Sequence, residues 1–139
     1  NAPGAPPFIP LICYEAIFPG QIQVDREKNR PGWLLNLTND AWFGYSSGPY
    51  QHFASAQLRS VELGLPLVRV ANTGISGVID SYGRVRVRTV LNEEISVESP
   101  LPARLSNSTW FAKHGNTTIF CIVLILFGVF RLRFFVTKG

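Results

Sequence analysis

The residue best suited to covalent chemistry is Cys13, which ends the apolar run at residues 8–13 and precedes Tyr14 and Glu15. A thiol attacks as its thiolate, and its attack on a carbonyl creates an oxyanion that needs hydrogen-bond donors. A cysteine in the turn after a strand has the next backbone N–H groups available, and we expect Tyr14 to supply one. A lone buried cysteine is more often an inert core residue. The neighbouring residues favour a nucleophile.

A polar and aromatic segment at residues 36–44, Asn-Leu-Thr-Asn-Asp-Ala-Trp-Phe-Gly, follows the second apolar run. Trp42 and Phe43 could belong to the hydrophobic core, but we favour a lipid-facing position, because aromatic side chains suit a membrane interface. We expect His52 to be a packed or surface histidine and not a base. With His114 it forms no metal-ligand spacing, so we predict no metal site and no cofactor.

The two cysteines, Cys13 and Cys121, lie in parts of the chain with different character. A disulfide between them would have to join the polar, globular part to the apolar C-terminal run. We therefore expect two free thiols. Cys121 is predicted to be a small apolar residue of a helix.

The net charge of +4 belongs to the C-terminal tail. Residues 1–115 hold ten Lys and Arg against nine Asp and Glu, whereas the tail holds three basic residues and no acid. A nucleic-acid surface would need cations clustered on the folded part. The distribution argues against a nucleic-acid partner and favours cations that flank a membrane.

The hydrophobic pattern predicts an α/β sheet with covering helices. Pro49 marks the start of one helix, which Gly64 and Pro66 should end. A second helix at residues 15–28 would be interrupted at residues 19–20 by Pro-Gly. The expected strands are residues 8–13, 33–38, 66–71, 75–81, 84–90 and 94–99.

The C-terminal apolar run predicts a transmembrane helix at residues 116–136, followed by a short cytoplasmic tail at residues 137–139. Sixteen uncharged residues precede Arg131, fewer than the roughly 20 usually needed to span a bilayer. Arg131 and Arg133 can extend their charged ends to the interface, which lengthens the usable segment. A buried core helix is the alternative. The basic end should face the cytoplasm, which places the preceding domain outside.

Five short motifs stand out along the chain. They are PLICYE at 10–15, NDAWFG at 39–44, GPYQHF at 48–53, RSVE at 59–62 and NTGIS at 72–76. With these motifs the chain resembles the nitrilase superfamily and, within it, the apolipoprotein N-acyltransferases of Gram-negative envelopes. The chain opens on Asn1 and holds no methionine, and we expect it to be a C-terminal piece of a longer protein.

That resemblance implies a fold and a location. Residues 1–100 would be the C-terminal part of a nitrilase-like (CN hydrolase) α-β-β-α sandwich, and residues 101–115 a linker to the single transmembrane helix. The full-length parent would be a multi-pass protein of the bacterial inner membrane with its catalytic domain in the periplasm. The reaction would move an acyl chain from a phospholipid, through a cysteine thioester, to the diacylglyceryl-cysteine of an apolipoprotein.

The resemblance also assigns roles to residues. Cys13 would be the nucleophile, Tyr14 and Glu15 would shape its site, and Trp42 and Phe43 would lie near the acyl entrance. For Glu15, a carboxylate favoured at a helix start is an equal alternative. The family's glutamate base and oxyanion-binding lysine lie N-terminal to the cysteine, and the twelve residues before Cys13 include neither acid nor base.

Because two members of that triad are missing, the chain alone should not turn over. A soluble carbon-nitrogen hydrolase and a non-catalytic membrane-anchored subunit are the alternative functions. The apolar tail argues against the soluble hydrolase.

Overall fold

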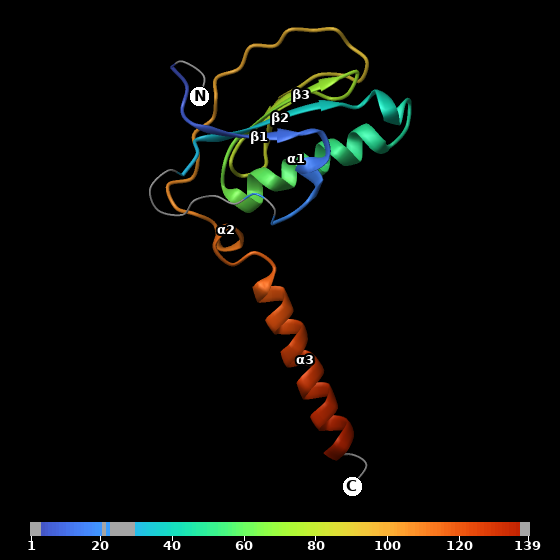
Figure 1. Cartoon of the computed structure of the whole chain (residues 1–139), viewed down its shortest axis with the longest axis vertical. Coiled ribbons are helices and arrows are strands. Elements are labelled where there is room, and N and C mark those ends of the chain that lie inside the picture. Colours follow the sequence, from blue (N-terminus) through green and yellow to red (C-terminus); the bar gives the residue numbers. More distant parts are fainter. Residues whose placement is uncertain (1–3, 21, 23–29, 137–139) are drawn as a thin grey trace.

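A five-stranded mixed sheet forms the centre of the protein, in the order β1-β2-β3-β4-β5 (Figure 1). The computed structural model describes residues 4–20, 22 and 30–136. The first three strands are parallel and the last two are antiparallel additions. The strands are β1 (Phe8–Ile12), β2 (Trp33–Asn39), β3 (Leu67–Asn72), β4 (Gly77–Ile79) and β5 (Val85–Arg88). The carboxyl ends of the three parallel strands therefore meet at one edge of the sheet.

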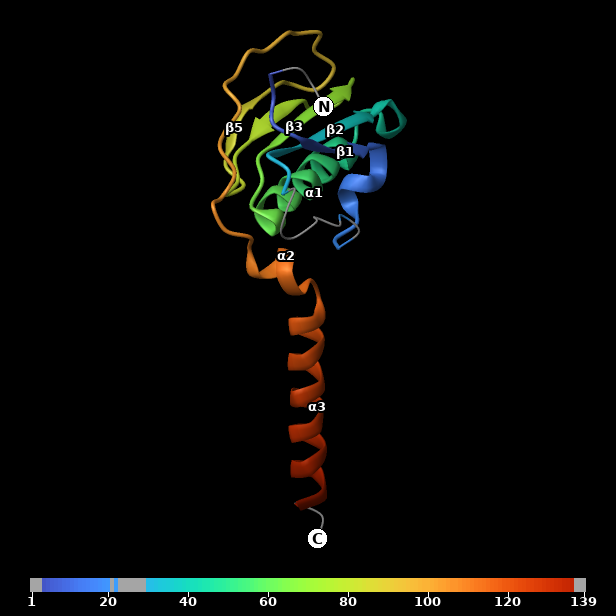
Figure 2. The same cartoon turned by 60° about the vertical axis from the view of Figure 1, so that its left-hand side comes forward.

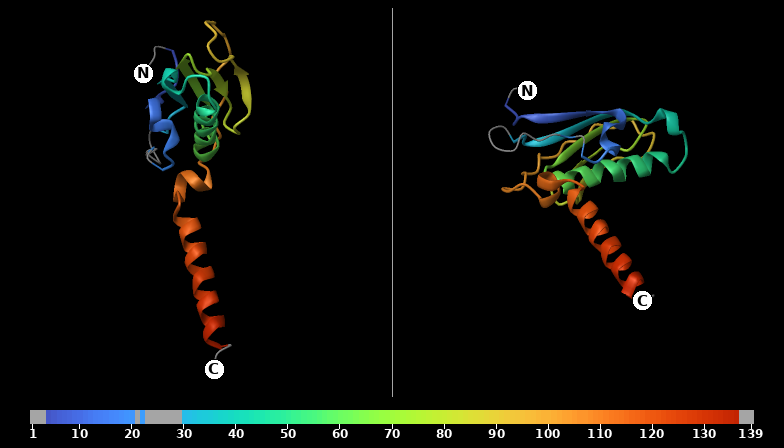
Figure 3. Two further views of the ribbon diagram at one scale, coloured as in Figure 1. Left: turned by 90° about the vertical axis from the view of Figure 1, so that its right-hand side faces the viewer. Right: turned by 60° about the horizontal axis from the view of Figure 1, so that its bottom comes forward.

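One helix, α1 (Gly48–Leu63), covers one face of this sheet (Figure 3). It begins as predicted with Pro49 in its first turn, and it ends at Gly64, whose φ of 62° is the left-handed conformation that glycine adopts without strain. Its buried side meets alternate strand residues to form the hydrophobic core. The core residues are Leu11, Ala16, Leu34, Phe53, Ala56, Leu63, Leu65, Leu67, Ile75 and Ile79.

The opposite face of the sheet is apolar but is not fully buried. Because side chains alternate along a strand, the neighbours of core residues point to this second face. They are half-buried or exposed: Phe8, Ile12, Trp33, Leu35, Leu37, Val68 and Val70. The sheet thus carries one covered and one open apolar face.

Two predicted elements differ from the structure. Residues 94–99 are not a strand but part of a long irregular segment after β5 (Figure 2). Their alternating pattern is that of a strand, but in the part of the chain that the structure describes the segment pairs with no strand, and Ile95 and Val97 are exposed. The helix expected at residues 15–28 is, where described, only the 3₁₀ turn η1 (Cys13–Ile17), because Pro19 forces Phe18 into extended backbone. Residues 21 and 23–28 lie outside the described residues.

Two helices follow the irregular segment, the short α2 (Trp110–His114) and the long α3 (Thr117–Val136). The segment leading to α2 is attached to the end of α1, where the Thr109 hydroxyl donates to the Glu62 carbonyl. Arg30 reinforces this contact, because its guanidinium donates to the carbonyls of Leu63 and Leu105.

The C-terminal helix α3 projects away from the domain (Figure 1). Its apolar side chains between Ile119 and Phe130 are exposed all around the helix. Judged on the described residues, no helix combines the length and the apolar character that a membrane crossing requires. The helix is confirmed, and the crossing expected at residues 116–136 remains a prediction.

Two leucines of β2 test the difference between the faces of the sheet. Leu34 is fully buried under α1, whereas Leu37 is 41% exposed on the open face. We expect Leu34→Ala to lower the free energy of unfolding by about 2–5 kcal/mol, because it leaves a cavity. The matched control Leu37→Ala should cost less than about 1 kcal/mol. Chemical denaturation in detergent measures both, and equal losses would contradict this assignment of faces.

Candidate active site

Cys13 lies at the carboxyl edge of the parallel strands, directly after β1 and at the start of η1. Its φ of 53° is in the left-handed region, which is strained for a residue with a side chain. Such strain persists only where the surrounding structure imposes it, and it is typical of nucleophiles in sharp turns after a strand. The Cys13 thiol is half-buried, the Cys121 thiol is exposed, and both are free of disulfides.

The surroundings of the Cys13 sulfur stabilise its thiolate. The hydroxyl of Thr38 lies 3.5 Å from Sγ. The pKa of Cys13 is lowered by the hydrogen bond from this hydroxyl, and also by the backbone N–H groups of Asn39 and Tyr14. Burial and the charge of Asp40 act in the opposite direction, but the net shift of the pKa is downward. The sulfur thus faces three donors, of which the sequence predicted only the N–H of Tyr14.

A fully buried polar network lies behind these donors. Asp40 Oδ2 accepts a 2.7 Å hydrogen bond from Arg69 Nη2, and Asp40 Oδ1 lies 2.8 Å from His52 Nδ1. Nη1 of Arg69 donates to the side-chain oxygen of Asn36. All four side chains belong to residues at most 3% exposed.

Charged and hydrogen-bonding partners decide the protonation state of Asp40. Burial alone would raise its pKa, but the hydrogen bond from His52 and the charge of Arg69 outweigh burial and lower the pKa. Asp40 is therefore an anion at neutral pH. Because a carboxylate only accepts hydrogen bonds, His52 donates from Nδ1. Among the described residues, His52 Nε2 is buried without a hydrogen-bond partner.

The network connects every element around the thiol. Asn36 donates to the carbonyl of Leu11 in β1, 2.8 Å away, and Arg69 Nε donates to the carbonyl of Ile75 beyond β3. At Gly74 a side chain is excluded, because a Cβ there would lie 2.6 Å from that of Asp40. The motifs at 39–44, 48–53 and 72–76 thus meet around one carboxylate.

Aromatic rings cover the network on the side of the thiol. The ring of Tyr14 stacks on His52 at 5.3 Å between centroids, and Phe43 contacts both rings at 5.9–6.1 Å. Gly48 makes room for Phe43, since a Cβ there would lie 2.6 Å from its Cγ. The ring of Phe43 is therefore fixed on both sides.

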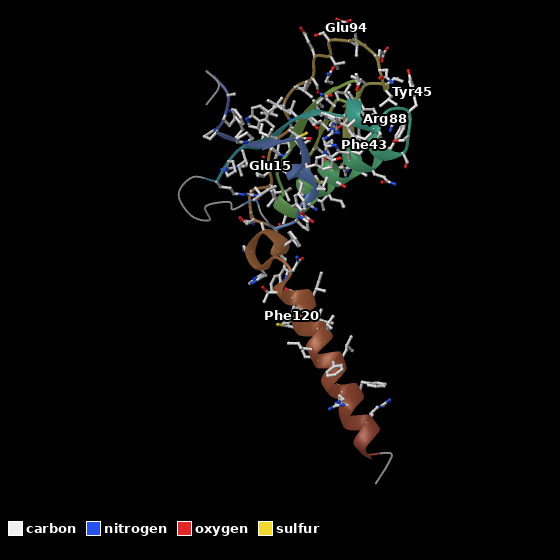
Figure 4. The ribbon with its side chains drawn as sticks, turned by 45° about the vertical axis from the view of Figure 1, so that its right-hand side comes forward. Glu15, Phe43, Tyr45, Arg88, Glu94 and Phe120 are labelled. Atoms are coloured by element: carbon white, nitrogen blue, oxygen red, sulfur yellow. The ribbon has the colours of Figure 1, made fainter. Side chains whose placement is uncertain are left out.

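Trp42 and Tyr45, on the same loop, are 83% and 90% exposed. Figure 4 shows Tyr45 at the outer edge of the domain and Phe43 further in. The two aromatic residues predicted to lie at the acyl entrance are thus placed differently: Phe43 packs beside Tyr14 and His52, and Trp42 faces outward.

Glu15 stabilises the backbone turn that carries the thiol. Its Oε2 accepts a 2.6 Å hydrogen bond from the N–H of Ile12, which precedes Cys13. This geometry is that of a carboxylate capping the start of a turn.

Sequence reasoning missed the half-buried Thr38 and three members of the buried network, Asn36, Asp40 and Arg69. It predicted a packed or surface His52, and His52 is packed at 3% exposure. A signal was present, because Asn36 and Arg69 interrupt apolar strand segments that α1 covers, where polar side chains need partners. No group of three His, Cys, Asp or Glu side chains in the described part of the chain is placed to hold a metal.

Comparison with known proteins shows the family of the chain. Residues 7–99 match the carbon-nitrogen hydrolase family, and the chain belongs to that family. Its curated relatives include proteins named apolipoprotein N-acyltransferase. The relative from Rhodopseudomonas palustris is 51% identical over 131 residues, which are 94% of this chain and 24% of the relative. The relative from Bradyrhizobium diazoefficiens is 52% identical over 123 residues, 88% of this chain and 22% of the relative.

A third relative of the same name, from Rickettsia bellii, is 50% identical over 118 residues, 85% of this chain and 23% of the relative. The chain therefore spans about a quarter of the length of the curated relatives it matches. The identity extends beyond the family match at residues 7–99, because 131 aligned residues must reach into the C-terminal part.

The buried ion pair can be tested against an exposed one in the same protein. We expect Arg69→Met to lower the free energy of unfolding by about 3–5 kcal/mol, because it leaves the Asp40 charge buried with one partner fewer. Arg86 lies 3.9 Å from Asp80 and is 58% exposed. The control Arg86→Met should cost about 0–1 kcal/mol. A similar small loss for both variants, measured by chemical denaturation, would show that the buried pair does not hold the domain together.

Proposed function

We propose that this chain is the thiol-bearing part of an apolipoprotein N-acyltransferase. The observation that carries the proposal is the strained Cys13 beside Thr38 and the N–H groups of Tyr14 and Asn39. The names of the relatives support the choice of reaction. The donor would be a phospholipid and the acceptor the amino terminus of a diacylglyceryl-cysteine on an apolipoprotein.

The first half-reaction would place an acyl chain on Cys13. The thiolate attacks the ester carbonyl carbon of the phospholipid, and a C–S bond replaces the C–O bond of the leaving lysophospholipid, whose oxygen takes a proton. The backbone N–H groups beside the sulfur are suited to the oxyanion formed in this step. The resemblance assigns the role of base to a glutamate and the binding of the oxyanion to a lysine, both upstream of the cysteine.

The second half-reaction would release the thiol. The uncharged α-amine of the acceptor attacks the thioester carbonyl, the C–S bond breaks with its electron pair remaining on sulfur, and the nitrogen loses a proton to the base. The product is an amide. We propose that Tyr14 and Phe43 line the site, that Glu15 holds its turn, and that Trp42 contacts lipid.

The open face of the sheet supports the proposal of an α-β-β-α sandwich. A single sheet covered on one side leaves its second apolar face in water, which a second sheet of the parent protein would bury. In that arrangement α1 and the sheet described above form two of the four layers. Residues 1–100 would then be the C-terminal part of the domain.

We also propose that residues 116–136 cross the bacterial inner membrane, with the domain on the periplasmic side. The 20 residues of α3 have a length of about 30 Å, close to the hydrocarbon thickness of a bilayer. Its exposed apolar side chains run from Ile119 to Phe130 without a charge. Residues 101–115, which include α2, would connect it to the domain.

The reaction can be tested in a chimera in which this chain replaces the matching quarter of the Rhodopseudomonas palustris relative. Incubated with phospholipid and no acceptor, the chimera should carry a fatty-acyl adduct on the peptide that contains Cys13. Mass spectrometry detects the adduct, and Cys13→Ala should abolish it. A folded chimera without an adduct, beside an acylated unmodified relative, would contradict the proposed function.

The membrane position of α3 can be tested on Cys121 in a Cys13→Ala chain in lipid vesicles. A membrane-impermeant maleimide should label Cys121 in detergent but not in intact vesicles. The control is Ser108→Cys in the same background, which lies before α2 and should be labelled in both conditions. Full labelling of Cys121 in intact vesicles would contradict a position within the bilayer.

A further inference from the structure

The Thr38 hydroxyl lies between two acceptors that compete for its single proton. Its oxygen is 3.5 Å from the Cys13 sulfur and 3.3 Å from Asp40 Oδ1. A hydroxyl rotates about its C–O bond and donates one hydrogen bond at a time. Thr38 can therefore serve the sulfur or the carboxylate, but not both at once.

Asp40 does not depend on the Thr38 hydroxyl, because it has other hydrogen-bond donors. Arg69 donates to Oδ2 at 2.7 Å, and His52 lies 2.8 Å from Oδ1. When the Thr38 hydroxyl turns away, the carboxylate keeps two strong partners, so no buried charge is left without donors. The same partners hold Asp40 in place, and this fixes the second position to which the hydroxyl can return.

We propose that the Thr38 hydroxyl is a switchable donor, which turns to the Cys13 sulfur when the sulfur is a thiolate and back to Asp40 when the sulfur is uncharged. The inference rests on the proposed function for its biological use. A thiolate is present before the first half-reaction and is released by the second, whereas a thioester sulfur is a weak acceptor. Thr38 acts through Cys13 and is a positioning residue.

The position of Thr38 in the sheet makes this arrangement rigid. It follows Leu37, which is paired with Ile12, and Cys13 is the next residue after Ile12. On the other side Thr38 is paired with Ala71 of β3. Pairing with β3 thus fixes the backbone of Thr38 itself, and pairing with β1 fixes that of the residue before it, so that only the hydroxyl proton needs to move. The hydrogen bond from Thr38 is the largest of the effects that lower the pKa of Cys13.

Other charged and titratable groups also surround the thiol and must be kept constant in a test. They are Asp40 after β2, Arg69 on β3, His52 on α1, and Tyr14 and Glu15 on η1. Substitutions at Thr38 leave all of them in the chain. The variants Thr38→Val, which keeps the shape without the hydroxyl, and Thr38→Ser, which keeps the hydroxyl, form a matched pair.

The test measures alkylation of Cys13 by iodoacetamide as a function of pH, in the full chain with Cys121→Ser in detergent. Thr38→Val should move the midpoint upward by about one pH unit and slow alkylation at neutral pH about tenfold. Thr38→Ser should restore the original midpoint. At high pH, where every thiol is ionised, both variants should react much like the starting protein.

A purely structural role for Thr38 would change the thermal unfolding of the valine variant and leave its midpoint in place, and that result would overturn the inference. If Thr38→Val does not fold, Thr38→Ser decides. An alkylation midpoint of Thr38→Ser that is as high as the midpoint of the unfolded chain would also overturn the inference. Alkylation by iodoacetamide needs no lipid. If the midpoint of Thr38→Val is shifted but phospholipid does not acylate Cys13, the result counts against the proposed function and not against the role of Thr38.

Discussion

The buried ion pair between Arg69 and Asp40 is the interaction on which the rest of the structure depends. Both side chains are removed from water, and a buried charge is tolerated only when it is paired and hydrogen-bonded. The pair connects β3 to the segment after β2, and through His52 and Asn36 it reaches α1 and β1. One salt bridge therefore sets the relative positions of the elements that surround the thiol.

The chemistry of Cys13 follows from that constraint. Its left-handed backbone is kept by the turn that Glu15 caps. Its sulfur faces the Thr38 hydroxyl and the Asn39 N–H, which β2 supplies, and the N–H of Tyr14 in η1. Asp40 lies near enough to disfavour the thiolate, and Arg69 offsets that effect because its positive charge also acts on Cys13. The site can hold an anionic sulfur because three hydrogen-bond donors outweigh burial and one nearby carboxylate, so that the pKa of Cys13 is lowered.

The sequence was sufficient to predict the strands β1 to β3, α1 and the position of Cys13, because apolar runs, Pro49 and Gly64 are local signals. It was not sufficient for residues 94–99, since an alternating pattern does not reveal whether a partner strand is within reach. The network was missed for a related reason. Arg69 and Asp40 are 29 residues apart, and only the parallel register that pairs Asn36 with Arg69 brings them together. The proposed membrane position of α3 rests on its apolar sequence.

The influence of the buried pair on the thiol can be measured by titrating the Cys13 thiolate through its ultraviolet absorbance. The comparison is between the Cys121→Ser chain and the same chain with Arg69→Met, under conditions where circular dichroism shows both to be folded. If Arg69 sets the charge at this site, its loss leaves Asp40 less compensated and raises the pKa of Cys13. An identical pKa in the two folded proteins would contradict the dependence of the thiol on the buried ion pair.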